Sequence, residues 1–299
     1  MRRLFLLFLL LLPFPAFCVG QAALPTLMLP THARYSAMGE AGGAACYDPG
    51  AVHYNPAGLF FIEPGAGIPV GATYDFEYLL PEFGLEDLTH RNVSLYGRYR
   101  ELFALAVTSN HISFGKNEWT DSLGRTLGWF NSYDDYIILS LAGKIPMVKG
   151  PASYALGLNF KYIYSNLADI IIGNRRIHAV AESFAFDFGF LYREQFLRIF
   201  SAGVTLQNMG PNIYYIRPDQ ADPLPFNLKV SLAAVYEKPG LLKATALFDM
   251  NKELVRRRDG DKDIQENGEV RLPDPFWKAF YTAWQDNSWQ TEKDEIIRS

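Results

Sequence analysis

The stretch Ser183-Phe-Ala-Phe-Asp-Phe-Gly-Phe-Leu-Tyr192 decides the fold class of this chain. Aromatic side chains occupy every second position, and mostly small or polar residues stand between them. A period of two places the aromatic rings on one face of a β-strand and Asp187 on the other. A half-buried strand of a soluble β-sandwich alternates in the same way, so this strand alone leaves two folds open.

The same alternation recurs in two further stretches. Residues 153–164 and 226–234 again separate apolar side chains from small, polar or charged ones. Long strands with one apolar face and one face carrying Lys, Asp and Asn are typical of a barrel with lipid outside and water inside. We therefore predict an all-β protein, an antiparallel transmembrane β-barrel. The polar residues predicted to face its lumen are Asn159, Lys161, Asp187, Lys229, Lys243, Asp249 and Asn251.

Residues 1–22 are typical of a secretory signal peptide. Arg2 and Arg3 form a positive start, residues 4–12 are apolar, and residues 20–22 fit a small-x-small cleavage site. The apolar run is short for a transmembrane helix, although a retained N-terminal anchor is the alternative. We expect export to the bacterial outer membrane, with Cys46 as the single cysteine of the mature chain.

Composition narrows the class further. Hydrophobic residues make up 49% of the chain and aromatic residues 15%, with a formal net charge of −4. No run after the signal peptide is long and apolar enough for a transmembrane helix, so the apolar surface is expected on strands. A mildly acidic exported protein binds nucleic acid poorly, so we expect no nucleic-acid partner.

The chain divides into four regions: a signal peptide at 1–22, an irregular N-terminal segment at 23–64, barrel strands at 65–251, and a long charged loop region at 252–299. Nine strands are predicted, with short turns on one rim and longer polar loops on the other. Bacterial barrels usually have an even strand number, so we expect an incomplete, C-terminally truncated barrel or one missed strand. The predicted strands are 65–76, 91–99, 102–109, 134–145, 152–165, 180–193, 197–208, 225–237 and 241–251, and the predicted long loops are 110–133, 166–179 and 209–224.

Two N-terminal motifs carry a family resemblance. Ser36-Ala-Met-Gly39 is followed by the run Asn55, Pro56, Ala57 and Gly58. Together they resemble the signature of the PorV/PorQ family of FadL-like outer-membrane barrels, where a Ser-Ala-Met-Gly-Gly type run precedes Tyr-x-Asn-Pro-Ala-Gly. This chain departs at Glu40, and Tyr54 adjoins Asn55 directly. Further similarity lies in residues 222–226, 248–252 and 273–284.

The resemblance implies that residues 23–64 form a hatch inside the barrel. Pro56 would fix φ, Gly58 would permit a positive φ, and Asn55 would bond neighbouring backbone groups. An irregular segment is tolerated inside a lumen because its backbone does not face lipid. An ordinary periplasmic turn before the first strand is the alternative.

The resemblance also implies a role in type IX protein secretion, as a component or a cargo shuttle. The implied partners are outer-membrane lipid and either secreted cargo proteins or secretion-machinery subunits. The alternative function is passive FadL-like transport of hydrophobic solutes or lipids, with hydrophobic small molecules as partners. A structural or adhesive surface protein is a third possibility.

Motifs for catalysis are missing from the sequence, so we expect no enzyme activity, no cofactor and no metal. The five histidines show no ligand spacing, and Cys46 has no basic neighbour in sequence that would activate its thiol. Residues 259–263 have the spaced acids of a calcium loop but lack its glycine and its closing glutamate. Arg256-Arg-Arg258 could bind lipopolysaccharide phosphates or belong to a solvated loop.

Overall fold

The computed structural model describes residues 22–29, 32–62, 70–100, 102–145, 152–172, 175–194, 200–238, 240–255 and 273–285, without the side chains of 169–177. The predicted signal peptide lies almost entirely outside these described residues. So do the calcium-loop-like run at 259–263 and the arginines at 256–258.

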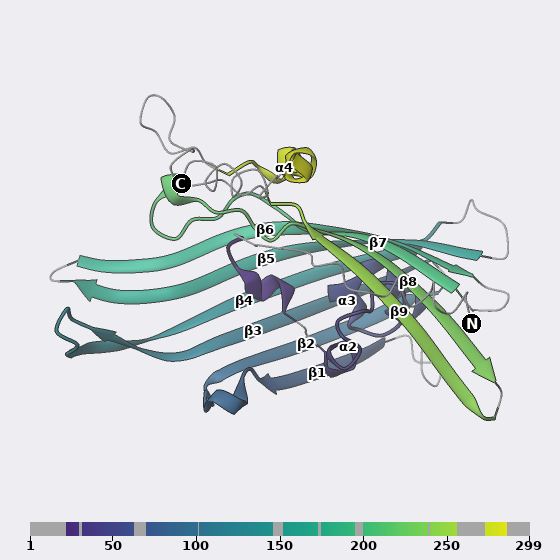
Figure 1. Cartoon of the computed structure of the whole chain (residues 1–299), viewed down its shortest axis with the longest axis horizontal. Helices are drawn as coiled ribbons and strands as arrows, with labels where there is room; N and C mark the ends of the chain where they lie inside the picture. Colours follow the sequence, from purple (N-terminus) through teal and green to yellow (C-terminus); the bar gives the residue numbers. More distant parts are fainter. Residues whose placement is uncertain are drawn as a thin grey trace, which may run out of the picture.

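The chain forms one nine-stranded antiparallel sheet in which each strand pairs with the next in sequence (Figure 1). The all-β prediction is confirmed, and no described helix has the length and apolar character needed to cross a membrane. The strands are β1 (Val70–Tyr78), β2 (Leu88–Tyr99), β3 (Phe103–Thr120), β4 (Thr126–Lys144), β5 (Ala152–Ile172), β6 (Arg175–Glu194), β7 (Phe200–Met209), β8 (Asn227–Lys238) and β9 (Leu242–Glu253).

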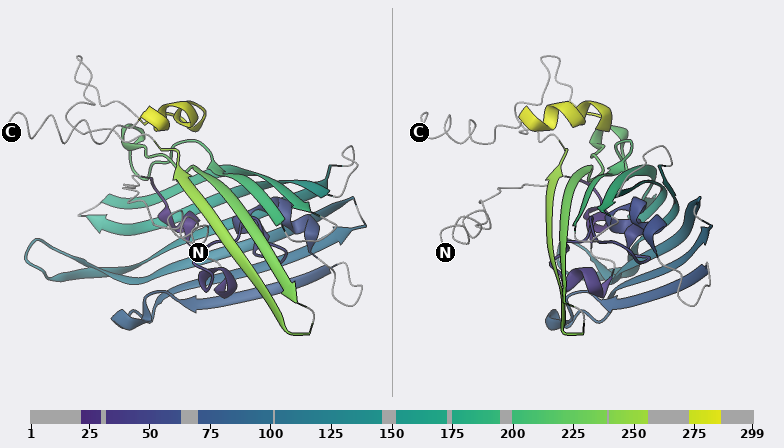
Figure 2. Two further views of the ribbon diagram at one scale, coloured as in Figure 1. Left: turned by 45° about the vertical axis from the view of Figure 1, so that its right-hand side comes forward. Right: turned by 90° about the vertical axis from the view of Figure 1, so that its right-hand side faces the viewer.

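The sheet curls into a barrel-like wall around the N-terminal segment, and β1 and β9 are its two edges (Figure 2). Alternation separates its two faces. On β6, Phe184 and Phe186 are 47% and 45% exposed on the outer face, whereas Ala185 and Asp187, which alternate with them along the strand, are fully buried on the inner face. The outer face is thus a broad exposed apolar surface, and the inner face is small or polar.

The prediction of long loops at 110–133 and 166–179 was wrong. β3 pairs with β4 as far as Thr120 and Thr126, and β5 pairs with β6 as far as residues 172 and 175. The apolar period fades along the end of β3, where polar residues such as Lys116 and Asn117 occupy both faces. The backbone ladder nevertheless continues through pairs such as Lys116 with Asn131, because it does not depend on apolar side chains. The loop predicted at 209–224 is confirmed, apart from one isolated bridge.

Short helices complete the fold. The region beyond residue 252 is not loop throughout, because β9 runs to Glu253 and residues 276–285 are helical. The helices are η1 (Pro25–Met28), α2 (Ala33–Ser36), α3 (Ala51–Tyr54), η2 (Pro56–Phe61), η4 (Pro81–Phe83), η5 (Pro218–Gln220), α4 (Phe276–Thr282) and η7 (Ala283–Gln285).

Candidate functional site: the N-terminal segment against the inner face

Residues 32–62, called here the hatch segment, lie against the inner face of the sheet (Figure 2). Their apolar side chains form a core in which Tyr35, Val52 and Leu59 are almost completely buried. The rings of Tyr35 and Tyr54 stack with centroids 4.0 Å apart. Small inner-face residues of the strands, mainly alanines, pack against this core. The segment therefore contributes the bulk that the inner face lacks.

Asn55 is the polar centre of the hatch segment and is completely buried. Its Nδ2 donates to the carbonyl oxygens of Gly43 and Phe190, each at 3.0 Å. Its Oδ1 accepts from the backbone N–H of Ala57 at 3.1 Å, which caps η2. Pro56 then occupies the first position of η2, where a missing N–H costs nothing. One side chain thus joins two parts of the hatch segment to β6.

Three inner-face glycines make room for this turn. Gly157 on β5 and Gly189 on β6 are register partners, and Gly203 lies on β7. A Cβ at any of them would come closer than 3.0 Å to the hatch segment: to the backbone at residues 56–57, to Asn55 and Pro56, or to Gly43 and Asn55. The three residues, called here the glycine cradle, allow the turn to rest directly on the strand backbones.

Gly58 is required because a side chain would not fit at this position, and not because of its backbone conformation. It is absent from the described glycines with positive φ, so the prediction of a left-handed turn there was wrong. A Cβ at this position would come closer than 3.0 Å to the carbonyl oxygen and the sulfur of Cys46. Gly58 therefore permits η2 to cross the loop at Cys46. Burial raises the pKa of the Cys46 thiol, which is an inert packed group.

The sheet also satisfies the carbonyl oxygens of α3. Asn159 on β5 donates to the carbonyl of Val52 at 2.7 Å, and Gln207 on β7 donates to that of His53 at 2.6 Å. A short helix leaves its last carbonyls without intrahelical donors, so inner-face amides replace the missing partners.

Behind Asn159 lies a buried charged network. Asp187 accepts from Asn159 at 2.7 Å and pairs with the Nζ of Lys161 at 2.9 Å. Lys161 also donates to Asn208 at 2.6 Å. Lys161 and Asp187 are at most 3% exposed, so each depends on the other for charge compensation. The structure thus brings together three of the residues that sequence analysis predicted to face the lumen.

The other four predicted residues divide into two pairs. Lys229 lies over the Tyr54 ring at 4.8 Å, and Asp249 accepts from the backbone N–H groups of Gly42 and Gly43, each at 3.0 Å. Lys243 and Asn251 are exposed on β9 and contact only strand residues among the described interactions: Lys243 lies 3.7 Å from Glu237, and Asn251 accepts from Asn227 at 3.2 Å.

A second anchor precedes the hatch segment. Thr26 of η1 donates to Asp134 on β4 at 2.6 Å, and Ser165 on β5 donates to the other oxygen of the same carboxylate at 2.5 Å. Asp134 is 1% exposed. Hydroxyl donors therefore satisfy a buried carboxylate that links residues 22–29 to the sheet.

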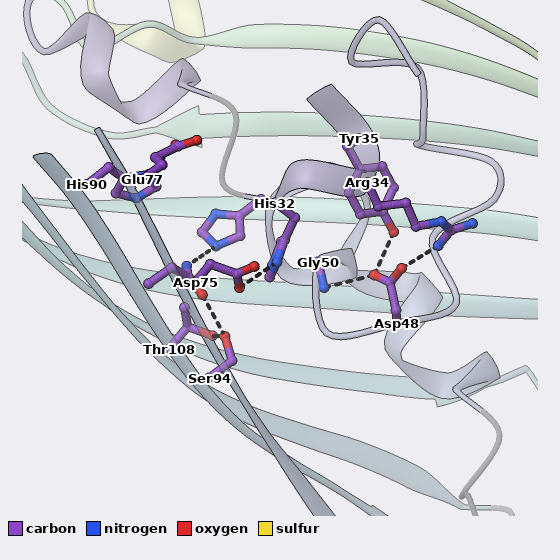
Figure 3. A network of polar contacts seen from close by, with 12 residues as sticks. His32, Arg34, Tyr35, Asp48, Gly50, Asp75, Glu77, His90, Ser94 and Thr108 are labelled. Carbon is purple, nitrogen blue, oxygen red and sulfur yellow. Dashed lines mark hydrogen bonds and ion pairs between the residues drawn. The ribbon is translucent and has the colours of Figure 1, made fainter. Parts of the chain in front are cut away.

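Three histidines, His32, His53 and His90, lie where the hatch segment faces β1 and β2. His32 Nδ1 lies 2.8 Å from Asp75, and His90 Nδ1 lies 2.9 Å from Glu77 (Figure 3). The rings of His32 and His53 are 6.0 Å apart, and Asn92 donates to His53 at 3.0 Å. Sequence spacing gave no sign of this convergence. Among the described residues, no group of three His, Cys, Asp or Glu could hold a metal ion.

Burial lowers the pKa of His53 well below its ordinary value, and the nearby His32, Lys161 and His90 add to this effect. The Asn92 amide donates to Nε2, which requires a neutral ring with a free lone pair there. His53 is therefore held neutral at the contact between hatch and sheet.

The loop before α3 has its own anchor. Asp48 accepts from the Tyr35 hydroxyl at 2.7 Å and from the Gly50 N–H at 2.9 Å, and it pairs with Arg34 (Figure 3). Burial raises the pKa of Tyr35, so the phenol remains a donor. These contacts fix the loop that supplies the Gly43 carbonyl to Asn55.

Filling the glycine cradle should displace the hatch segment. Gly189→Ala places a methyl group against Asn55 and Pro56, so the turn must move, at a cost of about 1–3 kcal/mol. We expect faster hydrogen–deuterium exchange in peptides covering residues 51–62. Gly128→Ala on β4 is the matched control, since its Cβ would meet only Trp119, at 3.8 Å. Equal exchange in both variants would contradict the role of the cradle.

Removing the Asn55 side chain should weaken the same contact chemically. Asn55→Ala leaves the Gly43 carbonyl and the Ala57 N–H without their side-chain partner, and an unsatisfied buried group costs about 1–3 kcal/mol. We expect that loss in the free energy of unfolding, measured by denaturant titration in micelles. Asn131→Ala, at an exposed position of β4, should change it little; similar values for the two variants would count against a central role of Asn55.

Acidification should loosen the hatch through His53. Its pKa is lower in the folded protein, so the unfolded chain binds the proton more readily as the pH falls below about 6.5. Stability from this residue is complete above that pH and is lost below it, at up to ~1.4 kcal/mol per pH unit. Hydrogen exchange in residues 51–62, corrected for its intrinsic pH dependence, should therefore accelerate between about pH 7.5 and about pH 5.

The control for this pH effect is His53→Gln, which keeps a hydrogen-bond acceptor for Asn92 but does not titrate. Its exchange should lose the part of the pH dependence that His53 causes, while the surrounding residues His32, His90, Asp75 and Glu77 are present in both proteins. His111→Gln, at a partly exposed histidine paired with Asp135, should behave as the wild type. An unchanged pH dependence in His53→Gln would refute the assignment.

Comparison with known proteins identifies the family. A family model described as type IX secretion system protein PorV matches residues 18–257. A comparison with curated proteins finds no match. The matched range includes the hatch segment, the glycine cradle and the nine described strands, and it confirms the family resemblance seen in the sequence. The similarity predicted at residues 273–284 lies outside this range and stays a prediction. This chain belongs to the PorV family of type IX secretion system proteins.

Proposed function

We propose that this protein is an outer-membrane component of type IX secretion and serves there as a cargo shuttle. The family match carries the secretion role. The membrane location is supported by the outer face of the sheet, where Leu139, Leu158 and Phe186 on three adjacent strands are 49%, 51% and 45% exposed. An apolar surface that spans several strands is costly in water and matches the hydrocarbon of a bilayer.

The position of the charges supports the same location. Lys161 and Asp187 lie on the inner face, where each has a partner. A charge on the lipid face at the midplane of a barrel costs about 2–4 kcal/mol, so this distribution suits a protein with lipid outside. The irregular backbone of the hatch segment also lies inside, where it needs no contact with lipid.

The contacts of the hatch segment favour a shuttle over a channel through which cargo passes. The hatch segment is bonded to strands from β1 to β9, by contacts such as those of Asp75 on β1, Asn159 on β5 and Asp249 on β9. A protein cargo passing through the inside would have to break this whole set. We therefore place cargo and machinery contacts at the rims of the sheet or on its outside. The role is non-catalytic, in keeping with the inert, buried Cys46.

Passive transport of hydrophobic solutes is the alternative function. It would need an apolar pocket beside the hatch. Where the described hatch segment meets β5 to β7, its neighbours include the glycine cradle and polar side chains such as Asn159, Thr205 and Gln207, and the apolar Ala155 and Leu191 are already packed against its core. This lining favours a protein segment as the resident of the inner face.

Deleting the gene in its own bacterium tests the proposal. We expect secreted cargo to accumulate unprocessed in the periplasm, and plasmid-borne wild type or Gly128→Ala to restore its surface display. Envelope fractionation, with gel mobility before and after boiling, checks that each protein is a folded membrane barrel. Unchanged surface display of all cargo would refute the secretion role. Loss of hydrophobic solute uptake with normal display would establish the alternative.

A further inference from the structure

Helix α4 lies against the outside of the sheet, above the ends of β7 and β8 (Figures 1 and 2). Phe276 and Phe280 pack with Phe226 and with Leu206 and Leu228, which belong to the outer-face set of β7 and β8. The ring centroids of Phe226 and Phe280 are 6.3 Å apart. One side of α4 is thus fixed to the apolar outer surface of the sheet.

Polar contacts hold the start of α4. Asp274 pairs with Lys278 at 2.9 Å and accepts from Thr282 at 3.0 Å. Asn212, in the loop between β7 and β8, donates to the carbonyl of Pro273 at 3.1 Å. The charge of Lys278 is therefore balanced by a carboxylate just before the helix. These bonds fix which side of α4 points away from the sheet.

The side that points away carries three large aromatic residues. Trp277, Tyr281 and Trp284 are 63%, 72% and 57% exposed, and their spacing places them along one helix face. The indole N–H of Trp284 donates to the carbonyl of Phe280 at 2.9 Å, so this ring needs no water as a partner. Water is a poor environment for three such rings together.

The level of α4 along the strands suggests what covers these rings. Leu206 and Met209, which contact α4, are register partners of Phe188 and Phe186 on β6. Further along β6 in the same direction, Phe184 pairs with Tyr162, and Glu182 follows with Tyr164. The outer face therefore changes from Phe to Tyr and Glu within a few residues of α4. Such a change marks the boundary between hydrocarbon and headgroups in a barrel.

We propose that α4 and the adjoining η7 form a membrane-interface helix whose residues Trp277, Tyr281 and Trp284 enter the boundary between lipid headgroups and acyl chains. Trp and Tyr favour this boundary because they combine an apolar ring with one polar group. The exposed aromatic face is continuous with the outer apolar surface, since the adjoining side of α4, which carries Phe276 and Phe280, packs on that surface. The proposal rests on the outer-membrane location proposed above.

Tryptophan fluorescence in lipid vesicles tests this placement. The chain has five tryptophans; with Trp119, Trp129 and Trp289 replaced by Phe, only those of the helix remain. Adding Trp277→Phe or Trp284→Phe leaves one reporter. The full chain is inserted into phosphatidylcholine vesicles that contain phosphatidylcholine brominated either near the headgroup or near the chain end. We expect blue-shifted emission, weak quenching by aqueous acrylamide, and stronger quenching by the shallow bromine.

A depth standard separates failure of this proposal from failure of the membrane location. Leu139→Trp, with all five native tryptophans replaced by Phe, reports an outer-face position of β4 that lies between Ile137 and Leu141 and three strands away from β7, and it should be quenched more by the deep bromine. If this standard and heat-modifiable gel mobility show insertion while Trp277 and Trp284 keep water-like emission, the interface helix is refuted. The proposal would also be refuted if Trp277 and Trp284 were shielded from acrylamide only after a secretion partner is added. If the standard is not quenched, the membrane location itself fails.

Discussion

The close approach of the Asn55–Pro56 turn to the strand backbones is the constraint on which the rest of the structure depends. It requires glycine at three inner-face positions, Gly157 on β5, Gly189 on β6 and Gly203 on β7. A side chain at any of them would collide with the hatch segment. Once the turn rests there, Asn55 reaches the carbonyl of Phe190, and the inner-face amides reach the carbonyls of α3. Steric room therefore comes first, and the hydrogen bonds depend on it.

The same contact explains why polar residues are tolerated so deep in the protein. An irregular segment brings unpaired N–H and C=O groups to the inner face, and these must find partners there. Asn159, Gln207 and Asp249 supply them from three different strands. The polar inner face is thus complementary to a particular backbone, in addition to being hydrophilic. Its buried ion pair of Lys161 and Asp187 supports Asn159 from behind.

The sequence contains most of the information about the sheet and little about the site. Alternation at residues 183–192 reports directly on the two faces, because the side-chain period of a strand is fixed by its geometry. It fails at the end of β3, where polar residues such as Lys116 and Asn117 stand on both faces while backbone pairing continues. Gly157 and Gly189 stand in the alternating pattern, but their role needs knowledge of what lies opposite them. The meeting of His32, His53 and His90 depends on tertiary contact alone, and no spacing rule contains it.

The hydrogen bonds that Asp249 on β9 accepts from the hatch segment have a consequence for the order in which the contacts form. Neighbouring strands pair in sequence, so the sheet can grow by local hairpins with little loop-closure entropy. Asp249, however, is 207 residues away from Gly42, which it binds. The first part of the chain to be synthesised therefore completes its contacts only after the last described strand has arrived. Contacts of the hatch segment with β5 and β6 can form earlier, so its anchoring is complete only when the whole described sheet is in place.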